Sequence, residues 1–222
     1  MSDPQRINTS ATEIASKEGF YWGDEVTQSY FVQAERDMDR HWATHINPIL
    51  VQNLINYDHV LDLAAGHGRN SARLARHGKK ITIVDINPDN IRFCKQRFVG
   101  DSRFAYVCND GAVLNGIEDN SITFFYTFDS MVHFDIEIVL SYLKEAFRVL
   151  APGGRAFFHY SNFDQSPGAD FRKNPHWRNF MSRRLFEHFA LRAGFTIVQS
   201  GNQPWGKIPD LDAISLLEKP GT

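Results

Sequence analysis

The sequence has 222 residues, enough for one domain or for one domain with a small cap. Apolar residues make up 42% of the chain and aromatic residues 13%, an ordinary globular composition that argues against intrinsic disorder. The 24 basic residues are balanced by 26 acidic ones, for a net charge of −2. No global positive field is therefore available to hold a nucleic-acid backbone, which disfavours a general DNA- or RNA-binding protein.

The cysteines and the apolar runs indicate the compartment. Cys94 and Cys108 form no CxxC pair and no metal-ligand spacing, so we interpret both as buried free thiols in a reducing compartment. Residues 1–20 lack the apolar segment of a signal peptide. No stretch reaches the ~18 apolar residues that a membrane span needs. The sequence thus predicts a cytoplasmic protein without membrane contact.

The first predicted element is one long helix over 26–46, with a second helix beginning at Asn47-Pro48. His41 and His45 stand four apart in it, a spacing that can bind a metal. No third ligand accompanies them, so a core or surface pair is the preferred interpretation and no metal is expected.

Strand-like and helix-like segments alternate in the rest of the chain. Strands are predicted over 59–64, 80–85, 104–107, 121–127, 155–160, 195–199 and 213–217. Helices are predicted over 70–77, 88–98, 136–150 and 183–193. This alternation predicts an α/β fold, a three-layer sandwich with a seven-stranded, mostly parallel sheet between two layers of helices. The last two strands lack a helix between them, so the final strand is expected to be antiparallel.

The turn after the first strand carries two glycines, Gly66 and Gly68, which let the backbone bend sharply and approach a ligand. In open α/β sheets, ligands bind at the carboxyl ends of the strands, where this turn lies. A dinucleotide fingerprint would need a third glycine at the position of Ser71. Its absence, together with Asp62 inside the strand, counts against NAD.

Further motifs follow the other strands in order. Asp85 ends the second strand, where a ribose-binding carboxylate is expected. Together the segments VLDLAAGHG, VDINP, ND, FYTFDS and LAPGG resemble the class I S-adenosylmethionine-dependent methyltransferases, over about residues 55 to 218. The resemblance implies a Rossmann-like methyltransferase fold and S-adenosyl-L-methionine as the cofactor.

The resemblance also implies a role for each motif. The glycine turn would lie under the methionine portion of the cofactor, Asp85 would accept hydrogen bonds from the ribose, and Ile86 and Ala112 would pack on the adenine. The residues expected to bind the cofactor are Asp62, Ala64, Gly66, Gly68, Asn70, Asp85, Ile86, Asn109, Asp110, Gly111, Ala112 and Phe128. Turn capping is the alternative role for Asp62 and Asp110, and Arg69 is interpreted as a solvated residue at a helix start.

Methyl transfer from a sulfonium is an in-line displacement, so the site mostly aligns a nucleophile and excludes water. An amine must arrive neutral, and a hydroxyl usually needs a general base. The candidates beyond the fourth and fifth strands are Asp129, His133, His159 and Tyr160. A structural hydrogen bond is the alternative role for His133. Strand alternation sends His159 and Tyr160 to opposite faces, so one of them should face away from the pocket.

The long segment 161–181 has neither strand nor helix pattern, and loops of that length are often functional. It carries Arg172, Trp177 and Arg178, and we hypothesise that it forms the acceptor pocket and pairs with a carboxylate or phosphate. A solvated basic face is the alternative.

The chain is thus expected to comprise an N-terminal helical lid, 1–57, and a cofactor-binding domain, 58–222. Tyr21 and Trp22 of the lid would contact the acceptor, with ordinary packing as the alternative. The predicted function is methyl transfer to an O or N atom of a small molecule, with an anionic one favoured by the loop arginines. A nucleic-acid or protein methyltransferase, another enzyme on this fold and a non-catalytic partner protein remain as alternatives. Neither the acceptor nor the oligomeric state can be read from the sequence.

Overall fold

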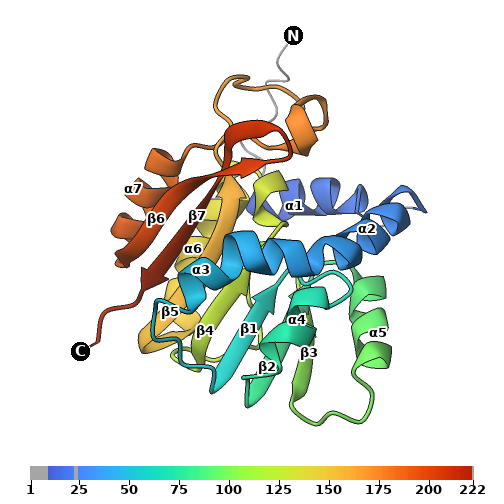
Figure 1. Ribbon diagram of the computed structural model, residues 1–222, viewed down its shortest axis with the longest axis vertical. Helices are drawn as coiled ribbons and strands as arrows, with labels where there is room; N and C mark the ends of the chain where they lie inside the picture. Colours follow the sequence, from blue (N-terminus) through green and yellow to red (C-terminus); the bar gives the residue numbers. More distant parts are fainter. Residues whose placement is uncertain (1–9, 23–24, 222) are drawn as a thin grey trace.

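The computed structural model describes residues 10–22 and 25–221. A seven-stranded sheet runs through the centre of the molecule in the order β3-β2-β1-β4-β5-β7-β6 (Figure 1). The strands are β1 (His59–Leu63), β2 (Lys80–Asp85), β3 (Phe104–Cys108), β4 (Ile122–Thr127), β5 (Leu150–Ser161), β6 (Thr196–Trp205) and β7 (Ile208–Glu218). Strands β1 to β5 pair in parallel, whereas β7 is antiparallel to both of its neighbours. The predicted mostly parallel sheet with an antiparallel last strand is confirmed.

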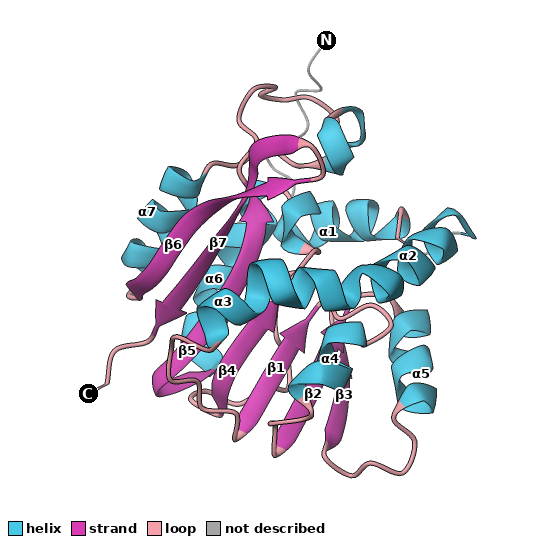
Figure 2. Cartoon of the chain, viewed as in Figure 1, coloured by secondary structure: helices cyan, strands magenta, loops and turns pink. Residues whose placement is uncertain are grey.

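Helices cover both faces of this sheet, which confirms the three-layer sandwich (Figure 2). They are α1 (Ala11–Phe20), α2 (Glu25–His41), α3 (Asn47–Leu50), α4 (Arg69–Leu74), α5 (Pro88–Arg97), α6 (Ile136–Val149) and α7 (Arg183–Ala193). One hydrophobic core lies between the sheet and α6 and α7, and it includes part of α1. The other lies between the sheet and α3, α4 and α5.

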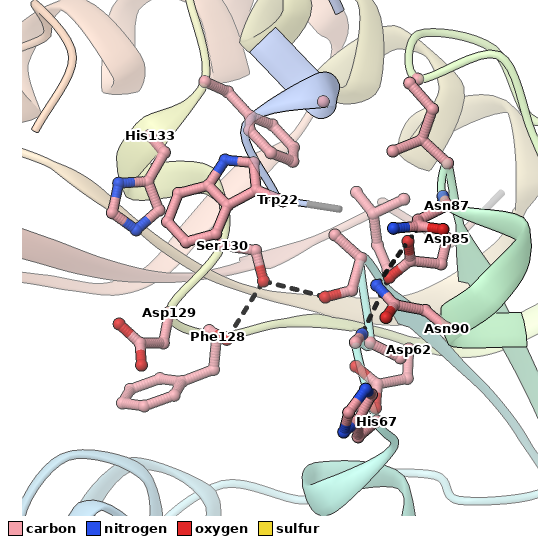
Figure 3. A pocket seen from close by; sticks show the side chains of 18 of the residues that line it. Trp22, Asp62, His67, Asp85, Asn87, Asn90, Phe128, Asp129, Ser130 and His133 are labelled. Carbon is pink, nitrogen blue, oxygen red and sulfur yellow. Dashed lines mark hydrogen bonds between the residues drawn. The ribbon is translucent and has the colours of Figure 1, made fainter. Parts of the chain in front are cut away.

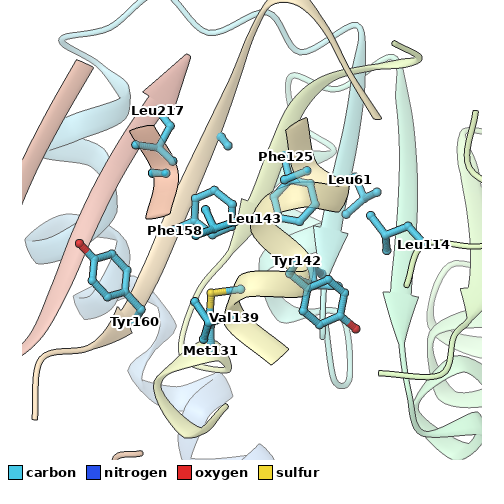
Figure 4. Packing of buried hydrophobic residues seen from close by; sticks show 14 of the residues in the cluster. Leu61, Leu114, Phe125, Met131, Val139, Tyr142, Leu143, Phe158, Tyr160 and Leu217 are labelled. Atoms are coloured by element: carbon cyan, nitrogen blue, oxygen red, sulfur yellow. The ribbon is translucent and has the colours of Figure 1, made fainter. Parts of the chain in front are cut away.

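The central strand β4 shows why the sheet is buried on both sides. Phe125 points toward α6 and packs against Phe158 of β5, with the ring centroids 5.3 Å apart (Figure 4). Its neighbours Phe124 and Tyr126 point to the opposite core. A strand between two helix layers needs apolar side chains on both faces, so its sequence reads as a continuous apolar run.

The helix ends follow the capping signals in the sequence. Asn87, Asp135 and Ser182 each accept a hydrogen bond from a backbone N–H in the first turn of α5, α6 and α7. Gly194 ends α7 with a φ of 104°, a conformation that favours glycine. These local rules therefore place the main helices correctly.

The amino-terminal segment differs from the prediction. A helix over 11–20 was not predicted, although Ser10 and Glu13 form a capping box at its start. The long helix does not break at Asn47-Pro48 but passes through a π-helical turn, Trp42–Ile46, into α3. Proline has no N–H, and the wider turn accommodates it without ending the helix.

Three further details correct the sequence interpretation. Cys94 is buried but Cys108 is exposed, because it lies at the end of the edge strand β3. The β6–β7 hairpin is about twice as long as predicted, and the segment 161–181 has two short 3₁₀ turns, Phe171–Lys173 and Pro175–Trp177. Within the described part of the chain, no helix is long and apolar enough to cross a membrane.

Candidate cofactor and acceptor pocket

Helices α1 and α2 lie across the carboxyl ends of the central strands (Figure 1). Residues of these helices and of the segments after β1, β2 and β4 line a pocket. Its empty volume is about 1060 Å³, including open solvent at the mouth. The lining residues are Ala15, Glu18, Gly19, Trp22, Tyr30, Phe31, Glu35, Asp62, Leu63, Ala64, Ala65, Gly66, His67, Arg69, Asn70, Asp85, Ile86, Asn87, Asn90, Asn109, Gly111, Phe128, Asp129, Ser130, His133, Phe134, Ile138 and Tyr142.

The glycine turn forms one wall of this pocket. Gly66 has a φ of 56°, and a Cβ atom there would lie 2.8 Å from the ring of Phe31. Phe31 belongs to α2 and stacks on His67 with the ring centroids 3.9 Å apart, so the second helix lies directly on the turn. Gly68 also has a positive φ, but it faces Phe98 and does not line the pocket. Its role is to begin α4.

Two buried carboxyl groups lie beside the turn (Figure 3). The Oδ2 atom of Asp85 accepts a 2.8 Å hydrogen bond from the N–H of Gly66, and Oδ1 accepts one from the N–H of Asn87. Asp62 accepts a 2.5 Å hydrogen bond from the hydroxyl of Ser71. Burial raises the pKa of Asp85, and it raises that of Asp62 to about 7. Both groups retain lone pairs for hydroxyl or amine donors.

The segment after β3 supplies a further hydrogen-bond acceptor to the pocket wall. Asn109 donates its amide hydrogens to the carbonyl of Val113 and to the hydroxyl of Tyr142, at 3.0 and 2.8 Å. Its Oδ1 atom is buried and has no hydrogen-bond partner among the described residues. A hydrogen-bond acceptor without a protein partner in a pocket wall can accept a hydrogen bond from an amine group of a ligand. Asp110 instead accepts from the N–H groups of Ala112 and Val113, the alternative turn-capping role, and neither Asp110 nor Ala112 lines the pocket.

The predicted base Asp129 is tied into an ion pair. Its Oδ2 atom accepts hydrogen bonds from Arg69, at 2.8 Å, and from the hydroxyl of Tyr30, at 2.7 Å. Burial acts to raise the pKa of Asp129, but Arg69 and Arg178 hold it below its usual range. Arg69 is 8% exposed, so the interpretation as a solvated residue is wrong. Asp129 is therefore an ionised, paired carboxylate at the pocket wall.

His133 lies on the same side of the pocket, against the ring of Trp22 with the centroids 4.5 Å apart (Figure 3). Its Nδ1 atom is 2.8 Å from the carbonyl oxygen of Trp177. Because a carbonyl only accepts, Nδ1 carries the proton and Nε2 has the free lone pair. Burial and the charge of Arg178 lower the pKa of His133 to about 4. At neutral pH this histidine is an uncharged base.

His159 and Tyr160 point to opposite faces of β5, as the strand alternation predicts, but neither lines the pocket. His159 accepts a hydrogen bond from the N–H of Asp129 and donates one to Asp212. The hydroxyl of Tyr160 bonds to Ser215. Both side chains are fully engaged in the interior, so the structure does not place either of them as a catalytic base.

The arginines of the segment 161–181 do not form an acceptor pocket. Arg178 is 2% exposed and forms a two-pronged ion pair with Asp212, whereas Arg172 pairs with Asp170 beside the ring of Tyr21. Neither arginine lines the pocket, and of the predicted acceptor residues only Trp22 does. Trp177 lies edge-on to Trp22 with the ring centroids 5.7 Å apart.

Several lining residues were missed by the sequence analysis. Ala15 and Gly19 of α1 pack against Ile86 and Gly111, and Glu18 and Tyr30 also face the pocket. The capping box at the start of α1 was the one local signal for this wall. The rest depends on tertiary packing, which no spacing in the sequence reveals.

Comparison with known proteins identifies this architecture. Residues 60–154 match the family model described as a methyltransferase domain. The chain contains a class I S-adenosylmethionine-dependent methyltransferase domain. S-Adenosyl-L-methionine is the cofactor of that family. Its adenosine portion carries hydroxyl and amine groups. These groups match the carboxyl groups of Asp62 and Asp85, the turn at Gly66 and the unpartnered Oδ1 atom of Asn109.

Two relatives in sequence and one solved structure that resemble the chain are also named methyltransferases. A ubiquinone/menaquinone biosynthesis C-methyltransferase of Zymomonas mobilis is 33% identical over 104 residues, which cover 45% of this chain and 41% of that protein. A demethylmenaquinone methyltransferase of Clavibacter sepedonicus is 33% identical over 102 residues, covering 44% and 39%. The chain thus spans about two fifths of the length of these relatives. An S-adenosylmethionine-dependent methyltransferase from Mesorhizobium loti shares the fold, with a TM-score of 0.63, 13% identity and coverage of 77% of this chain and 96% of that one.

Proposed function

We propose that the protein transfers a methyl group from S-adenosylmethionine to a small, uncharged molecule that carries an acidic O–H or N–H group on a flat ring. The observation that carries the proposal is that the cofactor residues and the neutral base His133 face one cavity. The expected binding residues Asp62 and Asp85 lie at one end of it, and His133 and Trp22 lie at the other (Figure 3). Gly66 belongs to the first end, where its N–H bonds to Asp85.

The charges of the pocket argue for an uncharged acceptor. Four carboxyl side chains besides that of Asp62 line the cavity, those of Glu18, Glu35, Asp85 and Asp129. The lining contains one guanidinium, that of Arg69, and it already pairs with Asp129. A carboxylate or phosphate would enter this cavity against like charges, and the described lining residues leave it no unpaired cation. The anionic acceptor that the loop arginines favoured therefore loses its support.

The walls argue for a flat, apolar ring. Trp22, Tyr30, His133 and Phe134 line the acceptor end, and Trp22 contacts both Tyr30 and His133. Aromatic walls bury large ring area and favour edge-on or stacked contacts with an aromatic ligand. A hydroxyaromatic or a nitrogen heterocycle matches these surfaces.

His133 provides the proton transfer in this account. S-Adenosylmethionine supplies an electrophilic methyl group when it is bound; the bond from sulfur to the methyl carbon breaks, and S-adenosylhomocysteine leaves as a neutral thioether. Nε2 of His133 accepts the proton of the acceptor O–H or N–H as the new bond to the methyl carbon forms, and Nδ1–H stays bonded to the carbonyl of Trp177. Residues of α1 and α2 line the cavity, and we expect these helices to exclude water from it once both ligands are bound.

A carbon target is the second candidate. The two relatives described above are named a C-methyltransferase and a demethylmenaquinone methyltransferase. Deprotonation of a ring hydroxyl places negative charge on the ring carbons next to it, so the same base serves C-methylation. O- and C-methyl products are distinguished by their carbon chemical shifts.

The test is incorporation of label from methyl-labelled S-adenosylmethionine into an acceptor panel. The panel contains neutral phenols, hydroxy-heteroaromatics, amines, the matching benzoates and aryl phosphates, and a tRNA and a DNA oligonucleotide. We expect turnover with neutral ring acceptors, at a rate that falls in His133→Gln but not in His188→Gln, an exposed histidine of α7. Preferred turnover of benzoates, aryl phosphates or nucleic acid would contradict the proposal.

A further inference from the structure

The buried carboxylate of Asp212 lies outside the pocket, yet it is connected to two residues that line it. Asp212 is a residue of β7 and has no exposed surface. Its two oxygens accept hydrogen bonds from Arg178, at 2.7 and 2.6 Å, and from Nε2 of His159, at 3.0 Å. We propose that Asp212 is the positioning residue that fixes both the tautomer of His133 and the backbone of Asp129. The first half of this inference rests on the proposed role of His133.

The first connection runs through Arg178 to the carbonyl that holds His133. His176 and Trp177 have φ angles of 48° and 57°, a conformation that is strained for side chains other than glycine. The guanidinium of Arg178 donates to the carbonyl of His176 at 3.0 Å, and its other two nitrogens donate to the carboxylate of Asp212. It also lies over the ring of Trp205, 4.9 Å from the centroid. This anchored side chain holds the turn in which the Trp177 carbonyl points at Nδ1 of His133.

Neighbouring hydrogen bonds also act on this region. Asn179 donates from its backbone to the carbonyl of Val132 and from its side chain to that of His133. These bonds keep residue 179 beside the 3₁₀ turn Met131–His133. Two backbone bonds act on the turn itself, from the N–H of Trp177 to the carbonyl of Asn174 at 3.0 Å and from the N–H of Arg178 to that of Pro175 at 3.1 Å. The ion pair between Arg178 and Asp212 adds to these bonds by fixing the carbonyl of His176, and so it helps to orient the Trp177 carbonyl.

The second connection runs through His159 to Asp129. The N–H of Asp129 donates to Nδ1 of His159 at 3.0 Å, so Nδ1 carries the lone pair and Nε2 carries the proton that Asp212 accepts. Asp129 has a φ of 63°, again strained for a residue other than glycine. One carboxylate thus holds His133 and His159 in opposite tautomers, Nδ1–H in the first and Nε2–H in the second.

Replacement by asparagine removes this arrangement with little change in volume. The carboxylate of Asp212 accepts three N–H groups, whereas an asparagine has one acceptor oxygen and an NH₂ group that opposes the donors. The Arg178 charge would then be buried without its partner. Among the described residues, the other charged groups near His133 are Asp129, on the β4 side, and Glu18 of α1, which accepts a hydrogen bond from Asn179. Neither of them replaces the missing carboxylate.

The test uses the protein without cofactor, with ¹⁵N-labelled histidine, and reads the ring nitrogens and the Asp129 amide by NMR at pH 7. In the wild type we expect His133 as the Nδ1–H tautomer and His159 as Nε2–H. In Asp212→Asn the ratio of Nε2–H to Nδ1–H at His133 should rise at least about fivefold, the change that loss of one hydrogen bond produces. The amide signal of Asp129 should also move.

Two further variants keep the proposal testable if Asp212→Asn does not fold. Arg178→Lys keeps the positive charge but loses the two-pronged hydrogen bonding of the guanidinium. It should shift the tautomer of His133 and leave that of His159 unchanged. The matched control is Glu218→Gln, which breaks the Arg155–Glu218 pair between the same two strands at their other end. It should change neither histidine. A folded Asp212→Asn or Arg178→Lys protein with the wild-type His133 tautomer would overturn the proposal.

Turnover separates this inference from the proposed function. Once an acceptor is known, Asp212→Asn and Arg178→Lys should lower kcat about tenfold or more and leave the affinity for S-adenosylmethionine within about twofold. A protein that shows the tautomer shift but does not bind S-adenosylmethionine would contradict the proposed function alone. A protein that binds it without the tautomer shift would contradict this inference alone.

Discussion

The two ends of the pocket are built in different ways. At the cofactor end, the functional groups come from turns that directly follow β1, β2 and β3, so each motif is contiguous in the sequence. At the acceptor end, the walls come from two parts of the chain: α1, the α1–α2 junction and α2 form the first, and the turn after β4 forms the second. Tyr30 and Asp129, which bond to each other across this end, are 99 residues apart. The first end is determined by local backbone geometry and the second by tertiary packing.

This difference teaches what each end tolerates. The cofactor end depends on positive φ angles and on N–H groups held by Asp85, features that few other sequences can supply. The acceptor end depends on side-chain surfaces such as that of Trp22, which a few substitutions can reshape. We therefore expect variants at the first end to change cofactor affinity and variants at the second to change kcat or the acceptor KM.

The largest effect is expected for the base at the acceptor end. His133→Gln should lower kcat by about 10²- to 10⁴-fold, because His133 is the lining residue that we assign as the base for the acceptor proton. Its Kd for S-adenosylmethionine, measured by calorimetry, should stay within about twofold. A variant with unchanged kcat would show that positioning alone drives transfer and that His133 is structural.

At the cofactor end, Asp85→Asn should weaken S-adenosylmethionine binding by about 10- to 100-fold, because hydrogen bonds to a charged acceptor are lost. The matched control is Asp89→Asn, an exposed carboxylate in the first turn of α5. Titration calorimetry measures both. Equal affinity in Asp85→Asn and Asp89→Asn would remove Asp85 from the binding site.

The two ends should also respond to pH in opposite directions. His133 has a pKa of about 4 in the folded protein and about 6.5 when unfolded, so the unfolded state binds more protons between these values and stability falls as the pH falls through them. The expected loss is about 3 kcal/mol, and it should be missing in His133→Gln.

Asp62 has a pKa raised to about 7, so its neutral form favours the folded state and stability is lost as the pH rises from about 4 toward 7. Asp62→Asn should remove that dependence. Urea unfolding at several pH values measures both variants against the wild type. The same pH slope in wild type and variant would contradict the assignment for that residue.

A smaller effect is expected for the aromatic wall. Trp22→Ala should raise the acceptor KM about tenfold, since it removes a large contact surface, and it should change the cofactor Kd little. Steady-state kinetics and calorimetry on the same preparation separate the two constants. A parallel loss of cofactor affinity would mean that Trp22 belongs to both ends.

The smallest effect is expected at Arg172. Its side chain is exposed and paired with Asp170 outside the pocket, so Arg172→Glu should leave the acceptor KM within about twofold. A tenfold rise in KM would restore the anionic acceptor that the sequence favoured.

The sequence predicted the sheet, its antiparallel last strand and most helix ends, because apolar runs and caps act locally. It also identified the turn at Gly66 and the acids Asp62 and Asp85, whose places follow from strand ends. It could not identify the burial of Arg69 or Arg178, because their carboxylate partners are 60 and 34 residues away along the chain. A charged residue with a distant partner has the same local sequence as a solvated one.

The boundary between lid and core also stays a prediction. The expected lid covers 1–57, and residues 1–9 and 23–24 of it lie outside the described part of the chain. The described helices α1 and α2 both face the pocket, which supports the assignment. Removal of residues 1–25 takes away Ala15, Gly19 and Trp22 and should abolish turnover, whereas a fully active truncated protein would end the lid hypothesis.

The most direct test of the account is isothermal titration of the purified protein with S-adenosylmethionine and, separately, with NAD. We expect micromolar binding of S-adenosylmethionine, weakened in Asp85→Asn but not in His133→Gln, and no binding of NAD. Binding of NAD in place of S-adenosylmethionine, or binding of neither, would contradict the assigned cofactor.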